Sequence, residues 1–364
     1  MFQVILQMKL FADIDIPKNK KPTSSDYELV CSSKKPDTIK CRELIEHWFD
    51  QFPKDNLNEF LGRFKSRMTE HHTGALFELF VYNLCLSLGF QTTRNTTAKI
   101  PDYKIVTSAN ETVFLECTVS GDSISKDPVH KNSGRLYEKL NEENLKYWIK
   151  IEVEKAGPNS IPEGKLLRII KSKVNLLDYE QELLKARNQN FSEEQLISVD
   201  DWEILVSFRA KPAEIFIEST DNIGLFSGGL MSIESPRYLI QAMNEKRTRN
   251  YEVNGMPYII ALNSLEIGLT EYEFLKALIG DSKELGFFNE SKNTSVSGVL
   301  LTRRLNSWTV REPNLTLYHN PWTKRPVNEN VFNLNQVKIE VNDRSHKLLR
   351  IDGLNGEAII KNMI

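Results

Sequence analysis

The sequence predicts an α/β protein whose core is a mixed sheet flanked by helices. Three observations support this class: an apolar helical pattern ending at Gly89, three short β-like segments within residues 90–119, and a return to helix-then-strand order over residues 236–262. The 364 residues are enough for about two domains or for one enlarged domain. We therefore expect two halves of one core, separated by an α+β insertion and followed by a C-terminal extension.

Composition excludes several broad classes of protein. Hydrophobic residues make up 40% and charged residues 26%, which is typical of a folded globular chain and excludes a disordered or collagen-like one. The net charge of −2 excludes a uniformly basic nucleic-acid coat, so any contact with a polyanion must be local. The four cysteines include no CxxC pair, which excludes a disulfide scaffold or a cysteine-rich zinc site and favours the cytoplasm.

The sequence predicts neither a signal peptide nor a membrane span. The N-terminal apolar segment is preceded by no basic residue, and no small-residue cleavage site follows it. The longest uncharged stretch, residues 79–93, falls short of the roughly 20 apolar residues that cross a bilayer. We expect residues 1–11 to form a strand or a partner contact.

Residues 1–72 are predicted to form an N-terminal strand and a helical region. The Lys-, Pro- and Ser-rich residues 16–39 indicate an exposed connection, and a helix is expected over residues 56–68. Residues 73–119 form the first half of the core. A buried helix begins near Thr73 and is capped by Gly89; strands follow at residues 90–94, 102–106 and 113–119, of which the last two form a hairpin.

Residues 120–232 are predicted to form the α+β insertion. Apolar and charged residues alternate over residues 148–154, which indicates a half-buried strand. A helix in one or two pieces is expected over residues 165–187, and strands are expected over residues 202–208 and 214–219. The glycine-rich residues 224–232 lack the GK[ST] signature of a phosphate-binding loop, so an ordinary loop is expected there.

The second half of the core is expected over residues 233–302. Ser235 and Pro236 are suited to begin a helix over residues 236–250. A buried strand follows at residues 256–262, then a helix at 270–280 and a strand at 297–302. The C-terminal extension, residues 303–364, should contain a strand pair around Trp308 and at residues 315–318, followed by a mixed tail.

Three acidic residues lie where acids are costly to place. Glu78 falls inside the apolar helix, and Asp102 and Glu116 fall on the predicted hairpin. Antiparallel partners keep a constant sum of residue numbers, so a turn centred near Ala109 places Asp102 opposite Glu116. Two like charges at that spacing favour a divalent cation between them, with Mg²⁺ or Mn²⁺ the natural choice. The alternative is a pair of solvated acids, because a register slip of one residue would separate them.

A helix that carries Glu78 is followed by a hairpin with Pro101-Asp102 and Glu116, and then by a second helix and a strand. This order of elements resembles the PD-(D/E)XK, or restriction-endonuclease-like, nuclease superfamily. The resemblance covers residues 73–119 and 233–262. It implies a restriction-endonuclease-like fold in which Asp102, Glu116 and the carbonyl of Cys117 bind Mg²⁺ (or Mn²⁺) and Glu78 assists them. It also implies hydrolysis of phosphodiester bonds in nucleic acid, with DNA the expected substrate, in bacterial restriction or phage defence. A homodimer or a defence-system partner would be consistent with that role.

The sequence departs from the family pattern at Thr118, where a lysine is expected two residues after the glutamate. That lysine would orient the nucleophile and offset charge in the transition state, which a hydroxyl does poorly. One alternative is therefore a catalytically inactive nuclease-like fold that binds nucleic acid or a protein. A scaffold with surface acids is a further alternative. Thr118 itself is a weak candidate for the site.

Lys246 is the best replacement for the missing cation. Leu239, Ala242 and Met243 form an apolar stripe on the helix over residues 236–250, and Lys246 continues it one turn later. Its side chain should therefore point toward the sheet and act as a catalytic residue. The alternative is a lysine that extends along the helix edge to solvent.

Two basic clusters could contact phosphates, although either could equally be solvated or packed surface. The first consists of Arg237, Arg247 and Arg249, and the resemblance adds Gln241 and Tyr251 as weak candidates on or after the same helix. The second combines basic and aromatic residues in a pattern typical of nucleic-acid grooves: Arg303, Arg304, Trp308, Arg311, Tyr318, His319, Trp322, Lys324 and Arg325. Within it, the segment LYHNPWTKRP (residues 317–326) is similar to a closing segment of uncharacterised bacterial proteins of this nuclease-like type.

Overall fold

The chain divides into two compact units. The first comprises Met1–Lys18, Ser24–Ile124 and Glu234–Ile364, and the second comprises Asn19–Thr23 and Ser125–Ile233. The second unit falls close to the insertion expected at residues 120–232. The computed structural model describes residues 9–11, 25–121, 140, 143, 145–155, 157, 162–186, 192–212, 223–227, 235–249, 251–265, 269–280, 285–290, 292–342 and 345–364.

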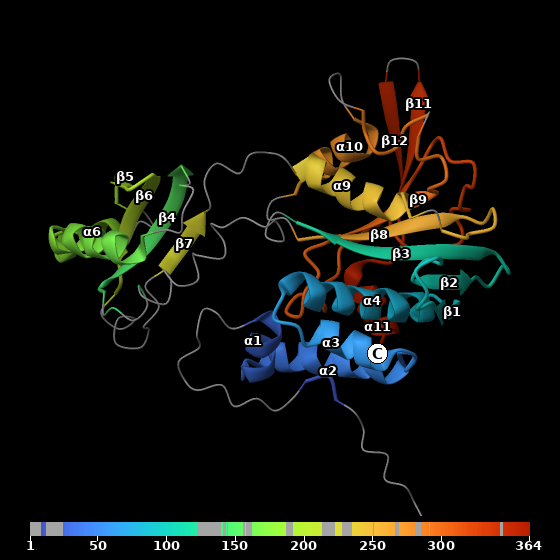
Figure 1. Ribbon diagram of the computed structural model, residues 1–364, viewed down its shortest axis with the longest axis horizontal. Helices are drawn as coiled ribbons and strands as arrows, with labels where there is room; N and C mark the ends of the chain where they lie inside the picture. The colour runs from blue at the N-terminus through green and yellow to red at the C-terminus, as the bar shows by residue number, and fades with distance from the viewer. Residues whose placement is uncertain are drawn as a thin grey trace, which may run out of the picture. The chain divides into compact units, whose positions relative to one another are not determined.

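The first unit is a mixed α/β structure built on an eight-stranded sheet (Figure 1). The strand order is β1-β2-β3-β8-β9-β10-β11-β12. β3, β8 and β9 run parallel to one another, while the β1-β2-β3 meander and the β9-β10 and β11-β12 pairs are antiparallel. The strands are β1 (Gln91–Arg94), β2 (Tyr103–Val106), β3 (Thr112–Ser120), β8 (Tyr258–Ser264), β9 (Gly298–Arg303), β10 (Leu315–His319), β11 (Gln336–Asn342) and β12 (Ser345–Ile351).

Helices cover both faces of this sheet. One face packs against α4 (Thr69–Ser87), which in turn packs on α2 (Pro36–Gln51) and α3 (Leu57–Phe64). The other face packs against α9 (Ser235–Arg247) and α10 (Glu271–Ile279), and Figure 1 shows these two helices on the side of the sheet opposite α4. No helix within the described residues is long and apolar enough to cross a bilayer.

Alternation along β3 assigns its residues to the two faces. Leu115 and Cys117 belong to the core beneath α4, whereas Phe114 belongs to the core beneath α9. Glu116 therefore lies on the α9 face, where it is 1% exposed. This face places a carboxylate in an apolar layer, which is costly unless the charge is paired.

The described residues of the second unit form a four-stranded sheet and two helices. The strand order is β5-β6-β4-β7, formed by β5 (Gln195–Val199), β6 (Trp202–Ala210), β4 (Tyr147–Lys155) and β7 (Ile223–Ser227). Its helices among the described residues are α6 (Glu163–Asn175) and α7 (Tyr179–Ala186). The predicted alternation holds in β4, because Ile149, Ile151 and Val153 are buried in the core that includes Leu166 and Ile170 of α6.

Several sequence expectations are wrong in detail. The described part of residues 16–39 is not an exposed connection, because it contains α1 (Asp26–Ser32) and the start of α2, with Tyr27 and Val30 buried. A capping box between Ser25 and Glu28 begins α1, and this signal was outweighed by the surrounding lysines and prolines.

Three further expectations concern strands. β5 was missed, and residues 223–227 form strand β7 where the glycine-rich pattern predicted a loop. Trp308 lies in a turn between β9 and β10 rather than in a strand, and β10 to β12 continue the large sheet into the C-terminal residues. The strand expected at residues 214–219 and most of the one at residues 1–11 lie outside the described residues.

Candidate active site

Asp102 and Glu116 lie side by side at the start of β2. The register pairs Tyr103 with Leu115, which is the register expected from a turn near Ala109. Asp102 immediately precedes β2 and so stands opposite Glu116 of β3. The sequence pattern therefore located this pair correctly, and the slipped register does not occur.

Each of the two carboxylates accepts a hydrogen bond from the main chain across the hairpin. The N–H of Asp102 donates to Glu116 Oε2 at 3.1 Å, and the N–H of Cys117 donates to Asp102 Oδ2 at 2.8 Å. Both side chains are thus fixed by main-chain donors of the neighbouring strand. Such reciprocal bonds hold the acids in one geometry at little entropic cost, since the strands are already ordered.

Lys246 reaches this pair from the end of α9. Its Nζ donates to Glu116 Oε1 at 2.7 Å, although the two residues are 130 positions apart in the chain. Leu239 and Met243 on the same stripe are fully buried, and the Lys246 side chain is 17% exposed. The stripe thus directs Lys246 inward, where its ammonium group balances the buried carboxylate.

A second cation approaches the same oxygen. The Arg249 guanidinium lies 3.7 Å from Glu116 Oε1 and donates to the hydroxyl of Tyr251 at 3.3 Å. Burial, followed by a hydrogen bond to Glu116, raises the pKa of the Tyr251 hydroxyl. Tyr251 is therefore a neutral donor at the edge of the site. The sequence expected Arg249 to contact phosphate, and the structure brings it to the acids.

Glu78 is positioned by α4 and held by Arg63. The Arg63 guanidinium donates to both oxygens of Glu78, at 2.6 and 2.7 Å, and its Nε lies 2.5 Å from Glu59. Tyr103 connects α4 to the hairpin because its hydroxyl donates to the backbone carbonyl of Glu78 at 2.9 Å. Sequence reasoning did not identify Arg63, whose amphipathic helix α3 gives no local sign of its partner.

Negative charge accumulates around Asp102. Burial, and next the charges of Glu78 and Glu116, raise the pKa of Asp102 to about 8. The ammonium group of Lys246 and the N–H of Cys117 oppose this increase. A carboxyl group whose pKa is raised by burial and by neighbouring acids is a candidate functional group, because such groups cluster at functional sites.

One further group at the site has no partner. The hydroxyl of Tyr258 on β8 is buried without a hydrogen bond to any described residue, and its ring packs edge-on against Tyr251 at 5.8 Å. Burial, and next the charge of Glu116, raise the pKa of this hydroxyl well above its usual value. An orphaned donor beside a carboxylate cluster is unusual in a structural core and is suited to a bound ligand or water.

The donor set fits a hard divalent cation. Mg²⁺ typically binds through one or two carboxylates, with water and substrate phosphate completing its shell. Asp102 and Glu116 supply two such carboxylates, and the raised pKa of Asp102 indicates where a cation would be stabilised. Within the described residues, no three His, Cys, Asp or Glu side chains form a ready-made metal cage. A pair of acids, with further ligands from water or substrate, is therefore the arrangement that a metal would use here.

The weaker candidates have different positions. Thr118 is half-buried on the same face of β3 as Glu116, two residues along. Cys117 contributes its N–H to Asp102, while its thiol is buried on the α4 face. Burial, and next the charge of Asp102, raise the pKa of that thiol. Gln241 is exposed and donates to Glu245, so it lies away from the acids.

The basic residues expected to contact nucleic acid are not gathered at one place. Arg237 is exposed at the start of α9, and Arg247 is half-buried with its Nε lacking a partner among the described residues. Arg303 is close to Glu271 and Tyr318, while Arg304, Lys324 and Arg325 lie in the connections flanking β10. Of the aromatic residues between them, Tyr318 is 1% exposed and Trp322 packs on the core beneath α9. For these two rings the structure therefore agrees with the alternative of packed aromatic residues and not with a nucleic-acid groove.

Comparison with known proteins gave no match to this chain: no family model, no curated protein and no solved structure is similar to it. Any assignment of chemistry must therefore come from the geometry of the acids and their cations.

Proposed function

We propose that this chain is a metal-dependent phosphodiester hydrolase acting on nucleic acid, with DNA as the expected substrate and a restriction-endonuclease-like arrangement of its core. The observation that supports it best is the contact between Lys246 and Glu116 at 2.7 Å. The ammonium group of Lys246 thus lies beside the acids. In the family pattern that charge comes from a lysine at the position that Thr118 occupies in this chain. The proposal includes a role in bacterial restriction or phage defence, which rests on the sequence resemblance alone.

Each residue has a distinct role in this proposal. Asp102 and Glu116 hold Mg²⁺ or Mn²⁺, and the carbonyl of Cys117 is a further candidate ligand. When bound, the ion would lower the pKa of an attacking water and neutralise the scissile phosphate. Lys246 stabilises the negative charge that develops on the phosphoryl oxygens. Glu78, on α4, adds negative charge near Asp102 and so assists the binding of the metal or its water.

A second candidate function is supported by a specific observation. Both oxygens of Glu116 and both oxygens of Glu78 already accept hydrogen bonds from protein groups. Such a closed network is stable without a metal and would suit a fold that has kept its geometry but lost catalysis. That fold would act as a binding module for nucleic acid or for a protein partner.

The first test is cleavage of supercoiled, linear and single-stranded DNA, and of RNA, with Mg²⁺, Mn²⁺ or EDTA. Wild type is compared with Asp102→Ala/Glu116→Ala and with Glu111→Gln, a charge change in the turn of the same hairpin. Purifying all three proteins in parallel controls for contaminating nucleases. Cleavage that requires metal, persists in Glu111→Gln and disappears in the double variant supports the hydrolase.

The opposite outcome separates the two candidates. Absence of cleavage under all conditions, together with nucleic-acid binding in EDTA that Asp102→Asn and Glu116→Gln leave unchanged, favours the binding module. Calorimetric titration with Mn²⁺ provides the second readout, because the hydrolase requires divalent binding that the same substitutions remove.

A further inference from the structure

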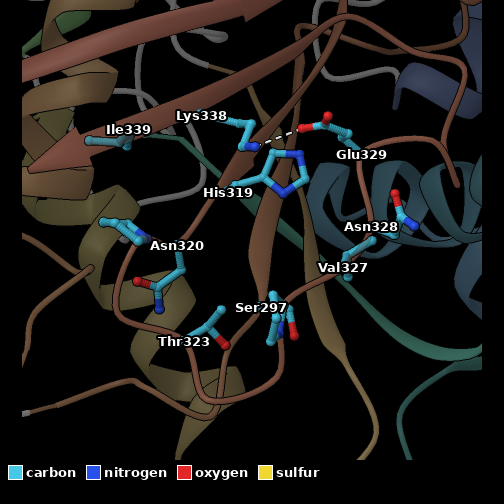
Figure 2. Close-up of a pocket in the computed structure, with 11 residues that line it drawn as sticks. Ser297, His319, Asn320, Thr323, Val327, Asn328, Glu329, Lys338 and Ile339 are labelled. Carbon is cyan, nitrogen blue, oxygen red and sulfur yellow. Dashed lines mark hydrogen bonds and ion pairs between the residues drawn. The ribbon is translucent and has the colours of Figure 1, made fainter.

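The segment LYHNPWTKRP, residues 317–326, borders a cavity that the proposed hydrolase site does not use. The cavity has a volume of about 360 Å³ and lies between the loop that follows β10 and strand β11 (Figure 2). This volume is near the lower limit of small-molecule sites, roughly 300–1,000 Å³. A ligand the size of a mononucleotide is therefore within its range, whereas a dinucleotide cofactor is not.

The sheet separates this cavity from the acidic site. His319 and Lys338 are register partners on β10 and β11. Across the sheet, His319 pairs with Gly298, which pairs with Ile259, which in turn pairs with Leu115. Leu115 is the residue next to Glu116 on β3. Since side chains alternate between faces, His319 points to the face opposite Glu116.

Hydrogen bonds fix which nitrogen of His319 carries a proton. The amide nitrogen of Gln336 donates to the carbonyls of Glu329 and Phe332, at 2.7 Å each. The amide oxygen of Gln336 must then accept, and it lies 2.7 Å from His319 Nε2, which is therefore the protonated nitrogen. Burial lowers the pKa of His319, so the ring is neutral at pH 7 and Nδ1 is an acceptor.

That acceptor is available to a ligand. Figure 2 shows the second ring nitrogen of His319 turned toward the interior of the cavity, away from the ion pair of Lys338 and Glu329. A neutral imidazole nitrogen in this position selects a ligand that carries an N–H or O–H donor. A metal cation could also use it, but within the described residues His319 belongs to no group of three or more His, Cys, Asp or Glu side chains that could hold one.

The cavity also offers a cation and apolar walls. Lys338 Nζ lies 2.7 Å from Glu329 Oε2, and the two side chains are 45% and 42% exposed. An ammonium group has three donors, so Lys338 can bind an anion while it keeps this pair. Pro321, Pro326 and Val327 line the cavity and present apolar surface suited to a flat ring.

We propose that this cavity binds a nucleoside monophosphate. A base N–H donates to His319 Nδ1, the base lies against Pro326 and Val327, and the phosphate pairs with Lys338. An amino acid would satisfy the same charges but would leave the apolar walls uncovered. The proposal stands independently of the hydrolase, because none of these residues belongs to the acidic site.

The test is calorimetric titration of the full chain with AMP, GMP, CMP and UMP in EDTA. EDTA removes metal-dependent binding at the acidic site, and the variants of Lys338 and His319 assign the binding that remains. Inorganic phosphate, unphosphorylated nucleosides and glycine are titrated separately as probes of each part of the ligand. We expect saturable binding of at least one nucleotide, with weaker binding of its nucleoside and of phosphate alone.

Variants locate the site. Lys338→Gln should weaken nucleotide binding about tenfold or more, since it removes a hydrogen bond to a charged group, and Lys338→Arg should retain most of it. Lys347→Gln, which changes an exposed lysine on the neighbouring strand β12, is the matched control and should have no effect. In wild type, bound nucleotide should also shift one histidine side-chain NMR signal that His319→Gln lacks.

Three results would overturn the assignment. They are the absence of saturable binding for all four nucleotides, binding that Lys338→Gln and His319→Gln leave intact, and binding of phosphate or glycine as tight as that of any nucleotide. None of these results depends on whether the chain cleaves nucleic acid, so this proposal and the hydrolase can fail separately.

Discussion

Asp102 and Glu116 each accept a hydrogen bond from the backbone beside the other, through the N–H groups of Asp102 and Cys117. These two bonds hold the carboxylates beside each other and prevent them from separating. Their mutual repulsion, added to the charge of Glu78, contributes to a pKa of about 8 for Asp102, whose largest cause is burial. Such an arrangement lowers the stability of the fold, as residues at functional sites commonly do.

Asp102→Asn should therefore stabilise the protein in EDTA. Asparagine keeps an oxygen that can accept from the Cys117 N–H but removes the charge. The folded pKa of Asp102 lies above its ordinary value of 3.8, so between those values the folded state holds a proton that the unfolded state has lost. Stability contributed by this group is then present at low pH and lost as pH rises through about 8.

Thermal unfolding of wild type and variant at pH 5 and pH 8.5 measures this effect. We expect the variant to melt at a higher temperature than wild type at pH 8.5, by about 2–4 °C for each kcal/mol gained in the free energy of unfolding. The difference should be smaller at pH 5. Adding Mg²⁺ should raise the melting temperature of wild type more than that of the variant. A variant that melts lower at pH 8.5 would show that Asp102 is a stabilising structural acid.

Lys246→Met should reduce turnover with substrate affinity largely unchanged, and it should also lower stability because the buried Glu116 loses its partner. The loss of one preorganised charge near the transition state typically costs roughly 10²- to 10³-fold in kcat. Lys361→Met, on the exposed face of α11 (Gly356–Asn362), removes an equal charge elsewhere and serves as the control. The measurement is kcat and KM for cleavage at saturating Mg²⁺. A change in KM alone would assign Lys246 to substrate binding instead.

The sequence located the acids better than it located their partners. The hairpin register and the stripe on α9 follow local periodicity, so Asp102, Glu116 and Lys246 could be placed before the structure. Arg63 and the orphaned hydroxyl of Tyr258 could not, because their positions depend on packing between segments far apart in the chain. Local pattern does not encode such tertiary contacts.

The fold shows the same division. The helix–hairpin unit and the helix–strand unit formed by α9 and β8 have strong hydrophobic periodicity and are present as expected. α1 was hidden by the lysines and prolines around it, and β7 by glycines that usually indicate loops. Strands were expected both around Trp308 and at residues 315–318, but only the second segment pairs with a neighbour, where Tyr318 of β10 faces Val299 of β9. Pairing partners, which sequence alone does not supply, decide such cases.

Arg63→Met should destabilise the protein because it leaves the carboxylate of Glu78 without its partner. The Glu78 side chain is 14% exposed, and without Arg63 its charge would lack its bidentate partner. We expect a loss of about 1–3 kcal/mol in the free energy of unfolding, the range for a buried group left unsatisfied. Urea unfolding of Arg63→Met, Glu78→Gln and the double variant completes a mutant cycle. Additive single effects would show that the pair does not couple.

His72 should make stability fall in mild acid. This residue is 2% exposed, and its two nitrogens contact the Phe64 carbonyl and the Ser307 hydroxyl. Burial lowers the pKa of His72 below its ordinary value of 6.5, a shift that the Phe64 carbonyl partly offsets. Below pH 6.5 the unfolded state therefore binds a proton that the folded state resists, and the free energy of unfolding decreases as pH falls.

Urea unfolding at pH 5.5, 6.5 and 8 measures this dependence. His72→Gln should be less stable than wild type at pH 8, because it leaves polar core groups imperfectly paired, but should lose less stability between pH 8 and pH 5.5. The matched control is His71→Gln, since His71 is the exposed neighbour on the same helix and should leave the pH dependence unchanged. An equal slope in wild type and His72→Gln would assign the acid sensitivity to other groups, the carboxylates first among them.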